Sequence, residues 1–429
     1  MRHILVPVLA LFASMTILLL GGGLMGTLLS VRLSFEAIDP QIKGVVLSAY
    51  YIGLVAGSLL ADRIIRSVGH IRAFAVFASV CAAAVLLQGL YVLPLSWLLL
   101  RVVIGFASAG TYMVVESWLN AHAGAEHRGR VFSIYQVVSY MALGAGQFLL
   151  YLGDPAGAEL FMIVGALYAL GLIPVALSRL GNPPEPTTHT PMALRRTLAR
   201  SPLAAWTCIA SGLMGGAIYT LTPAVGLRWG LEVGGVSFMM ASLILGGVLL
   251  QWPIGYLSDR YGRRGLIVAV ALATAVVSAL LAIVAQDMPF PVLLVTVMAF
   301  GGLSFTFYPL AVSQANDAMG PSGDFVAVAA ALLFLWGTSA AAGPVVAGAM
   351  ISVLGAPGLF FWMGGIALVT AIAAVLMRSQ EVPARAAYQI LTRTTAVIEE
   401  MDPRVREVEE SAAGSNLDVP DTDDSRDDG

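Results

Sequence analysis

The chain has 429 residues, of which 58% are hydrophobic and only 11% are charged. Soluble globular proteins carry about 25% charged residues, so the composition predicts a protein that crosses a lipid bilayer many times. The net charge of −3 gives no basis for nucleic-acid binding. The two cysteines, Cys81 and Cys208, both stand in apolar segments, where they are expected to pack as small side chains instead of forming a disulfide framework or a metal site.

The N-terminus resembles a signal peptide only superficially. Met1-Arg2-His3 precedes an apolar run that continues to about Val31. The apolar region of a signal peptide spans about 7–15 residues, and this run is much longer. We therefore expect a first spanning helix whose N-terminus lies in the cytoplasm.

Apolar runs of membrane-spanning length follow one another along the chain, separated by short polar breaks. Lipid offers no hydrogen-bond partner to an open backbone, so each run is expected to be a helix. The sequence predicts twelve spans, at about 5–31, 43–63, 71–92, 96–120, 130–152, 157–178, 202–227, 236–257, 265–286, 289–314, 325–352 and 357–377.

Basic residues fix the orientation of these spans. With the N-terminus inside, the inner loops and N-terminus hold Arg2, Arg63, Arg66, Arg72, Arg128, Arg130, Arg260, Arg263 and Arg264, whereas the outer loops hold Arg32, Lys43 and Arg228. Nine against three satisfies the positive-inside rule. The sequence thus predicts a multi-pass protein of the cytoplasmic (inner) membrane with both termini in the cytoplasm.

Breaks in composition predict the domain organisation. We expect an N-terminal six-helix bundle at 1–178, a cytoplasmic linker rich in proline and arginine at 179–201, and a C-terminal six-helix bundle at 202–378. Residues 379–429 form an acidic tail poor in apolar residues, which is expected to be disordered.

The two halves repeat each other. Gly105, Tyr112 and Asn120 recur 196 positions later as Gly301, Tyr308 and Asn316. Internal repeats of this kind place a binding site near mid-membrane, at the interface of the halves. The predicted fold class is therefore an all-α membrane protein of twelve transmembrane helices in two pseudo-symmetric six-helix bundles.

One face of the fourth span carries unusual polar residues. Arg101, Gly105, Ser108, Tyr112 and Glu116 are spaced by three or four positions and share a broad helical face. A charge at bilayer depth costs at least ~2.5–3.5 kcal/mol, so it usually faces a bundle interior or a wet cavity. The face predicts a transport pathway, with structural pairing to a neighbouring helix as the alternative.

Two further spans hold candidates for the same pathway. Gln136, Tyr140 and Gln147 follow one face of the fifth span, and Tyr308 and Gln314 lie in the tenth. Polar side chains in such helices also form interhelical hydrogen bonds without any role in transport. Both interpretations remain open for these residues.

The loop between the eighth and ninth spans carries a signature. Gly255-Tyr-Leu257-Ser258-Asp259-Arg260-Tyr-Gly262-Arg263-Arg264 resembles in full the inner-loop motif of the major facilitator superfamily. The first-half copy has Asp62 and Arg63, but its glycine, Gly69, follows seven residues after the aspartate instead of three. The resemblance implies an inner gate formed by Asp62, Arg63, Gly69, Arg72, Gly255, Asp259, Arg260, Gly262, Arg263 and Arg264.

Other motifs support and qualify this resemblance. Arg101-x-x-x-Gly105 is similar to a second signature of the superfamily, whose arginine is linked to substrate or proton coupling, although Ile104 replaces the usual glutamine. The Gly-Pro pair of the antiporter signature is absent from the fifth span. The run from Glu116 to Asn120, followed by Arg128-Gly129-Arg130, resembles the YcaD-like branch of the superfamily.

The sequence argues against an enzyme. No nucleotide-binding Gly-x-x-x-x-Gly-Lys motif, nucleophile elbow or pair of catalytic carboxylates occurs. His122, Glu126 and His127 do not have the spacing of a helical zinc motif. We expect no catalytic residues, metal or cofactor.

These features predict a secondary active transporter that moves a small organic solute by alternating access. Burial of Glu116 would favour its protonated form, so proton coupling through this residue is expected, with the proton gradient as driving force. Export is the expected direction because the pathway is largely apolar and aromatic. A solute importer and a non-transporting membrane sensor are the alternatives. The expected partners are the substrate and the bilayer, and the chain is expected to act as a monomer.

Overall fold

The computed structural model describes residues 2–122, 124–177, 194–319 and 325–377. Helices make up this part of the chain, which contains no strand. The predicted acidic tail at 379–429 and most of the predicted linker at 179–201 lie outside the described residues.

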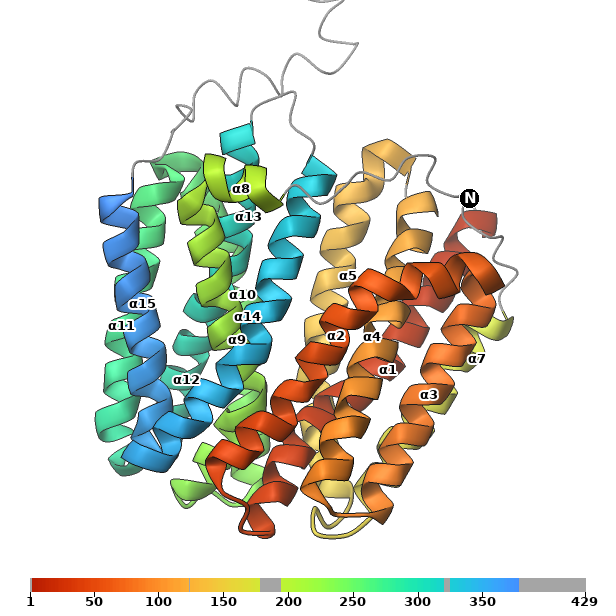
Figure 1. The fold of residues 1–429 in the computed structure, drawn as a ribbon, viewed down its shortest axis with the longest axis horizontal. Coiled ribbons are helices and arrows are strands. Elements are labelled where there is room, and N and C mark those ends of the chain that lie inside the picture. The colour runs from red at the N-terminus through yellow and green to blue at the C-terminus, as the bar shows by residue number, and fades with distance from the viewer. Residues whose placement is uncertain (1, 123, 178–193, 320–324, 378–429) are drawn as a thin grey trace, which may run out of the picture. The chain divides into compact units, whose positions relative to one another are not determined.

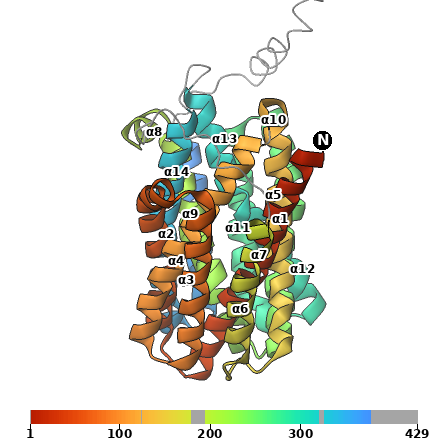
Figure 2. The same cartoon turned by 90° about the vertical axis from the view of Figure 1, so that its right-hand side faces the viewer.

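The first group of helices corresponds to the first half of the sequence and lies at the right of Figure 1. It consists of α1 (Arg2–Phe35), α2 (Pro40–Val68), α3 (His70–Leu90), α4 (Pro94–His122), α5 (Gly124–Gly146), the 3₁₀ helix η1 (Gln147–Leu152), α6 (Glu159–Leu170) and α7 (Leu172–Leu177). Figure 2 shows α6 and α7 following one another beside α1, with which both are in contact.

The second group lies at the left of Figure 1. It consists of α8 (Leu194–Arg200), α9 (Pro202–Arg228), α10 (Val233–Tyr261), α11 (Arg263–Val284), the 3₁₀ helix η2 (Ala285–Asp287), α12 (Phe290–Phe305), α13 (Phe307–Met319), α14 (Phe325–Leu354) and α15 (Pro357–Leu376). The short α8 falls inside the segment predicted as a linker.

Each predicted span coincides with helical structure, and the all-α membrane fold is confirmed. Eleven helical segments of the described part are long and apolar enough to cross a membrane. The remaining predicted span, 130–152, consists of α5 followed by η1 and is not among the eleven. The count of twelve therefore stays a prediction.

Two predicted spans are broken where a proline follows. The span at 289–314 divides into α12 and α13 at Thr306, three residues before Pro309. The span at 157–178 divides at Gly171, three residues before Pro174. A proline inside a helix removes one backbone hydrogen bond and its ring crowds the preceding turn, which accounts for both interruptions.

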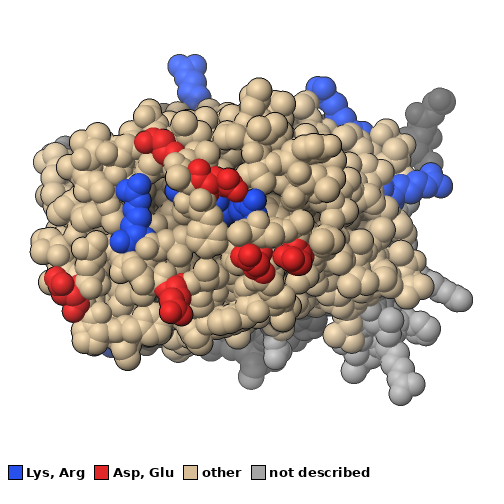
Figure 3. Space-filling view, turned by 90° about the horizontal axis from the view of Figure 1, so that it is seen from below, with Lys and Arg blue, Asp and Glu red and all other residues tan. Residues whose placement is uncertain are grey.

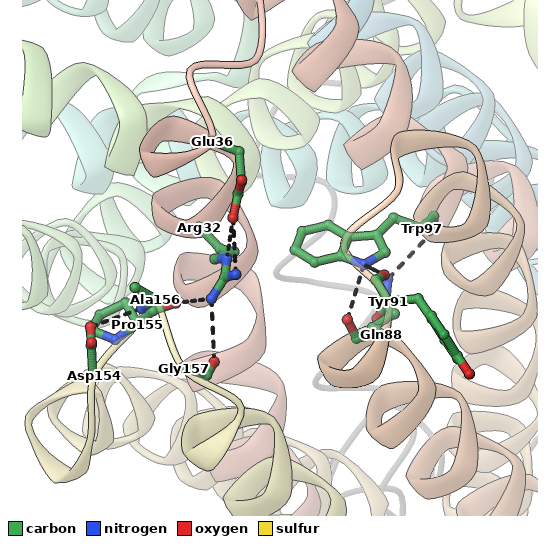
Figure 4. A network of polar contacts seen from close by, with 9 residues as sticks. All are labelled: Arg32, Glu36, Gln88, Tyr91, Trp97, Asp154, Pro155, Ala156 and Gly157. Carbon is green, nitrogen blue, oxygen red and sulfur yellow. Dashed lines mark hydrogen bonds and ion pairs between the residues drawn. The ribbon is translucent and has the colours of Figure 1, made fainter.

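We call the end of the bundle that holds Gly69, between α2 and α3, the upper end, and the end that holds the α1–α2 turn at 36–39 the lower end, as in Figure 1. At the lower end Arg32 forms an ion pair with Glu36 at 2.9 Å and donates hydrogen bonds to the carbonyls of Pro155 and Gly157 (Figure 4). In the same view the Trp97 indole donates to the Tyr91 carbonyl at 2.7 Å. These contacts fix the turns that connect the helices of the first group.

Glycine allows the second and fourth spans of each half to pack closely. A Cβ atom on Gly105 of α4 would overlap the carbonyl oxygen of Tyr50 in α2. A Cβ atom on Gly301 of α12 would likewise overlap the carbonyl oxygen of Leu243 in α10. Gly105 and Gly301 are the pair that repeats at an offset of 196, so the repeated glycines occupy equivalent packing positions in the two groups.

The turns that carry the gate motif are also equivalent. Gly69 joins α2 to α3 with φ 83°, and Gly262 joins α10 to α11 with φ 90°. Both values lie in the left-handed region that glycine adopts without strain. Gly69 lies four residues further from its aspartate than Gly262 does, and four residues correspond to about one helical turn. The first-half motif thus departs from the signature by one extra turn of α2.

Candidate functional site

A cavity of about 370 Å³ lies between the two groups of helices. Its walls come from α1, α2, α3, α4, α5, η1 and α6 on one side and from α9, α10 and α14 on the other. This volume falls within the range of small-molecule sites, about 300–1,000 Å³. The cavity is the candidate substrate site.

Arg101 of α4 lines this cavity and is buried, with 6% of its surface exposed. Its guanidinium carbon lies 4.5 Å from the centre of the Tyr50 ring, a cation–π arrangement. No described residue accepts a hydrogen bond from its Nε. Within the described part of the chain, no carboxylate forms an ion pair with Arg101, and the cavity walls contain no acidic residue. The site therefore holds one buried positive charge without a counter-ion.

Hydroxyl groups surround this arginine. Tyr50 lies within hydrogen-bonding reach of Ser108 and Tyr112, and Tyr168 of α6 is close enough to interact electrostatically with the guanidinium. Arg101, Ser108 and Tyr112 reach the same cavity because their spacing keeps them on one face of α4. Together these groups form a cationic wall rich in hydrogen-bond donors.

A second polar corner is formed by Gln147 of η1. Its amide nitrogen donates to the carbonyl of Gly23 at 3.0 Å and to that of Leu143 at 3.2 Å. The hydroxyl of Thr27 donates to its amide oxygen. Gln147 is buried and lines the cavity, so these bonds hold its side chain in place between α1 and α5.

The opposite wall is apolar and aromatic. Met240 and Ile244 of α10 and Leu333 and Trp336 of α14 line the cavity from the second group. The ring of Trp336 packs edge-on against that of Tyr51 in α2, with centroids 6.1 Å apart. The second group also contributes Tyr219 and Thr220 of α9, and the first group adds apolar residues such as Leu18 and Leu54. The cavity thus has a cationic, polar region around Arg101 within largely apolar walls.

The structure brings together three of the eight predicted pathway residues. Arg101, Tyr112 and Gln147 line the cavity. The other five, Glu116, Gln136, Tyr140, Tyr308 and Gln314, are not among its wall residues.

Glu116 lies beyond the cavity toward the upper end of α4. Its side chain is exposed, and it interacts electrostatically with Tyr135 of α5 and Tyr308 of α13. The carboxyl group is therefore placed between the two groups of helices.

The remaining predicted pathway residues differ in their surroundings. Tyr140 stacks on Phe305 of α12 with centroids 6.2 Å apart, and Phe305 stacks in turn on Tyr219 of α9 at 5.4 Å. This stack connects the two groups beside the cavity. Gln136 is exposed and Gln314 is buried.

The first-half gate residues contact their own helix. Asp62 forms an ion pair with Arg66, one turn further along α2, at 2.7 Å. Arg63 and Arg72 are exposed at the upper end.

The second-half gate arginines hold the upper end of the second group together. Arg263 of α11 forms an ion pair with Asp317 of α13. Arg264 donates to the carbonyls of Ala374 and Val375 at 2.6 Å, where the last carbonyls of α15 lack partners within the helix. Arg260 and Gly255 are exposed. The side chains of Asp259, His122, Glu126 and His127 lie outside the described residues.

Sequence reasoning missed part of the polar lining of the cavity. Tyr50, Thr27 and Tyr168 were not among the predicted pathway residues, although each is a polar side chain inside an apolar span. Arg101 was identified by the rule that charged and polar groups within the membrane face the interior. The rule applies more weakly to these three residues because tyrosine and threonine are common in ordinary membrane packing.

Comparison with known proteins identifies a family that shares this architecture. The Major Facilitator Superfamily profile matches residues 9–337 and 207–400. The "Uncharacterized MFS-type transporter YcaD" of Escherichia coli O139:H28 (strain E24377A / ETEC) is 30% identical over 346 residues, which cover 79% of this chain and 87% of that protein.

Solved structures share the fold at low identity. The crystal structure of the nucleoside transporter NupG is 17% identical, with a TM-score of 0.72, covering 87% of this chain and 98% of that one. That of the D-xylose-proton symporter is 13% identical, with a TM-score of 0.69, covering 86% and 96%. The chain therefore belongs to the Major Facilitator Superfamily of membrane transporters and resembles its YcaD branch.

Proposed function

We propose that this protein is a secondary active transporter that exports a small organic solute across the cytoplasmic membrane by alternating access, coupled to protons and acting as a monomer. The observation that carries the proposal is the cavity between the two groups of helices, with walls from both. A site at such an interface becomes accessible from either side when the two groups rock against each other.

Contacts between the two groups at the lower end indicate which conformation of the transport cycle this structure represents. The backbones of α2 and α14 approach so closely that a Cβ on Gly44 would overlap the carbonyl oxygen of Pro344. Asp39 accepts a hydrogen bond from Ser352 at 3.2 Å, and the rings of Phe148 and Phe238 pack at 5.2 Å. We infer that the lower end is closed in this state and that the cavity communicates with the upper end.

The distribution of charge supports a cytoplasmic upper end. The turns at the lower end hold or adjoin Glu36, Asp39, Asp154, Glu159, Glu232 and Asp287, beside Arg32, Lys43 and Arg228 (Figure 3). The upper end holds Arg63, Arg66, Arg72, Arg260, Arg263 and Arg264. An excess of arginine marks the cytoplasmic side, so in this orientation the cavity faces the cytoplasm.

Glu116 is our candidate for proton coupling. It is exposed here between α4, α5 and α13, where it can exchange a proton with water. Closure of the upper end would remove it from water and favour its neutral form. Proton uptake and release would then follow the conformational cycle.

Purified protein in proteoliposomes tests both parts of the proposal. A panel of nucleosides, sugars, amino acids and carboxylic acids is screened for counterflow, with protein-free liposomes as the control. For a transported compound, Glu116→Gln should keep counterflow but lose most of the acceleration that a pH gradient produces, whereas Glu159→Gln at the lower end should keep both. Counterflow of no compound would reject transport, and an undiminished pH-gradient effect in Glu116→Gln would reject the proton role.

A further inference from the structure

The unneutralised charge of Arg101 indicates what the cavity binds. Burying a cation away from water is costly unless it is paired, and the described residues offer Arg101 a tyrosine ring and hydroxyls but no carboxylate. The stability of the fold does not require a charged residue at position 101. A ligand that brings the missing negative charge would neutralise the site.

The geometry of the guanidinium leaves it able to bind such a ligand. The guanidinium carbon of Arg101 lies over the Tyr50 ring, 4.5 Å from its centroid, and the N–H donors of a guanidinium lie in its plane. Among the described residues, none accepts a hydrogen bond from Nε. Guanidinium groups bind carboxylates through two parallel hydrogen bonds. The hydroxyl of Tyr50, within hydrogen-bonding reach of those of Ser108 and Tyr112, lines the same cavity.

The opposite wall specifies the rest of the ligand. Met240, Ile244, Leu333 and Trp336 offer apolar surface, and a volume of about 370 Å³ admits a small molecule only. Because the walls carry a single positive charge, a monoanion leaves the site neutral, whereas a dianion leaves a net negative charge.

We propose that the substrate is a small amphipathic monocarboxylate whose carboxylate binds Arg101 and whose apolar body lies against α10 and α14. This inference deepens the transport function proposed above, and it rests on that function only in calling the ligand a substrate. Binding itself can be tested without transport.

The test uses full-length purified protein and matched ligands that differ only in charge. The probes are 4-phenylbutyrate, indole-3-acetate and octanoate, each paired with its neutral amide, together with 4-phenylbutylamine as a cation. Ligand binding to the folded state raises the thermal midpoint. We expect at least one acid to raise the midpoint and to bind at least about tenfold tighter than its amide, since a charge-assisted pair is lost with the amide.

Substitutions then assign the effect to Arg101. In Arg101→Gln the binding of that acid should weaken at least about tenfold and the preference over the amide should disappear. Arg228→Gln removes the same charge from an exposed position at the lower end and should leave binding unchanged. Arg101→Lys keeps the charge without the planar fork, so it should retain the preference for the acid at intermediate affinity, and it serves as the test if the glutamine variant does not fold.

Three results would overturn the inference: no acid binds, the amides or the amine bind as tightly as the acids, or the preference survives in Arg101→Gln. Counterflow measurements distinguish a failure of the proposed ligand class from a failure of the transport proposal. Binding of an acid without counterflow would reject transport and leave the ligand class standing. Counterflow of the amides but not of the acids would support transport and reject the ligand class.

Discussion

At the scale of single residues, Arg101 is unusual because burying its charge costs free energy that its contacts within the protein do not offset. The side chain is buried, stacks on Tyr50 and has no carboxylate partner within the described residues. Residues that are unfavourable for folding but line a cavity are typical of functional sites. The stability of the ligand-free protein therefore reports on the role of this residue.

Arg101→Met should stabilise the ligand-free protein. Methionine fills a similar volume and carries no charge, so removing the uncompensated cation should raise the free energy of unfolding by about 2 kcal/mol. The thermal midpoint of the purified protein in detergent measures the effect, with Arg228→Met as the control at an exposed position. A lower midpoint in Arg101→Met would show that the stacking on Tyr50 outweighs the cost of the buried charge.

At the scale of elements, the pairs α2–α4 and α10–α12 depend on the absence of side chains at the contact. Gly53 and Gly105 approach the backbones of α4 and α2, and Gly246 and Gly301 approach those of α12 and α10. Lipid gives apolar helices little reason to associate, so close van der Waals packing of small residues supplies much of the driving force. The α2–α4 contact also fixes the position of Tyr50 relative to Arg101.

Gly105→Ala should destabilise the protein, because its Cβ would overlap the Tyr50 carbonyl oxygen and force α2 and α4 apart. Overpacking of this kind costs about 1–3 kcal/mol, seen as a lower thermal midpoint. Gly365→Ala in α15 is the matched control, since nothing lies within 4 Å of the added atom. The control should be neutral or slightly stabilising. Equal midpoints for the two variants would contradict the packing argument.

At the scale of the whole transmembrane region, the two groups touch through a few interfaces that would have to separate during transport. The lower-end interface of α2 with α14 includes the hydrogen bond between Asp39 and Ser352 and the approach of Gly348 to Pro40. The arginines of the gate motif, by contrast, bind within the second group, Arg263 to Asp317 and Arg264 to the end of α15. In this state the described lower-end contacts join the two groups, whereas these two arginines stabilise the upper end of the second group.

A disulfide across the lower end should stop the cycle. Asp39→Cys combined with Ser352→Cys introduces thiols at two positions whose side chains are now joined by a hydrogen bond of 3.2 Å. Oxidation should abolish counterflow of a transported compound and reduction should restore it, whereas each single variant should remain active. Cys81 and Cys208 are buried and are not expected to interfere. Full activity of the cross-linked protein would show that the lower end need not open.

The sequence by itself determined the features that depend on local spacing and composition. Apolar runs define the helices because lipid leaves the backbone no other solution, and the three- and four-residue spacing in α4 places Arg101 and Tyr112 on one face. The offset of 196 between Gly105 and Gly301 also predicted that the halves repeat, and these glycines occupy matching contacts.

The tertiary structure decided what depends on how helices are rotated and stacked against each other. It brought Tyr50 from α2 and Tyr168 from α6 to Arg101, placed Glu116 outside the cavity wall, and gave the guanidinium no carboxylate partner among the described residues. A helix period determines which residues share a face, but the residues that oppose that face come from segments many positions away. Their depth and rotation are set by close packing of whole helices, which no local pattern in the chain encodes.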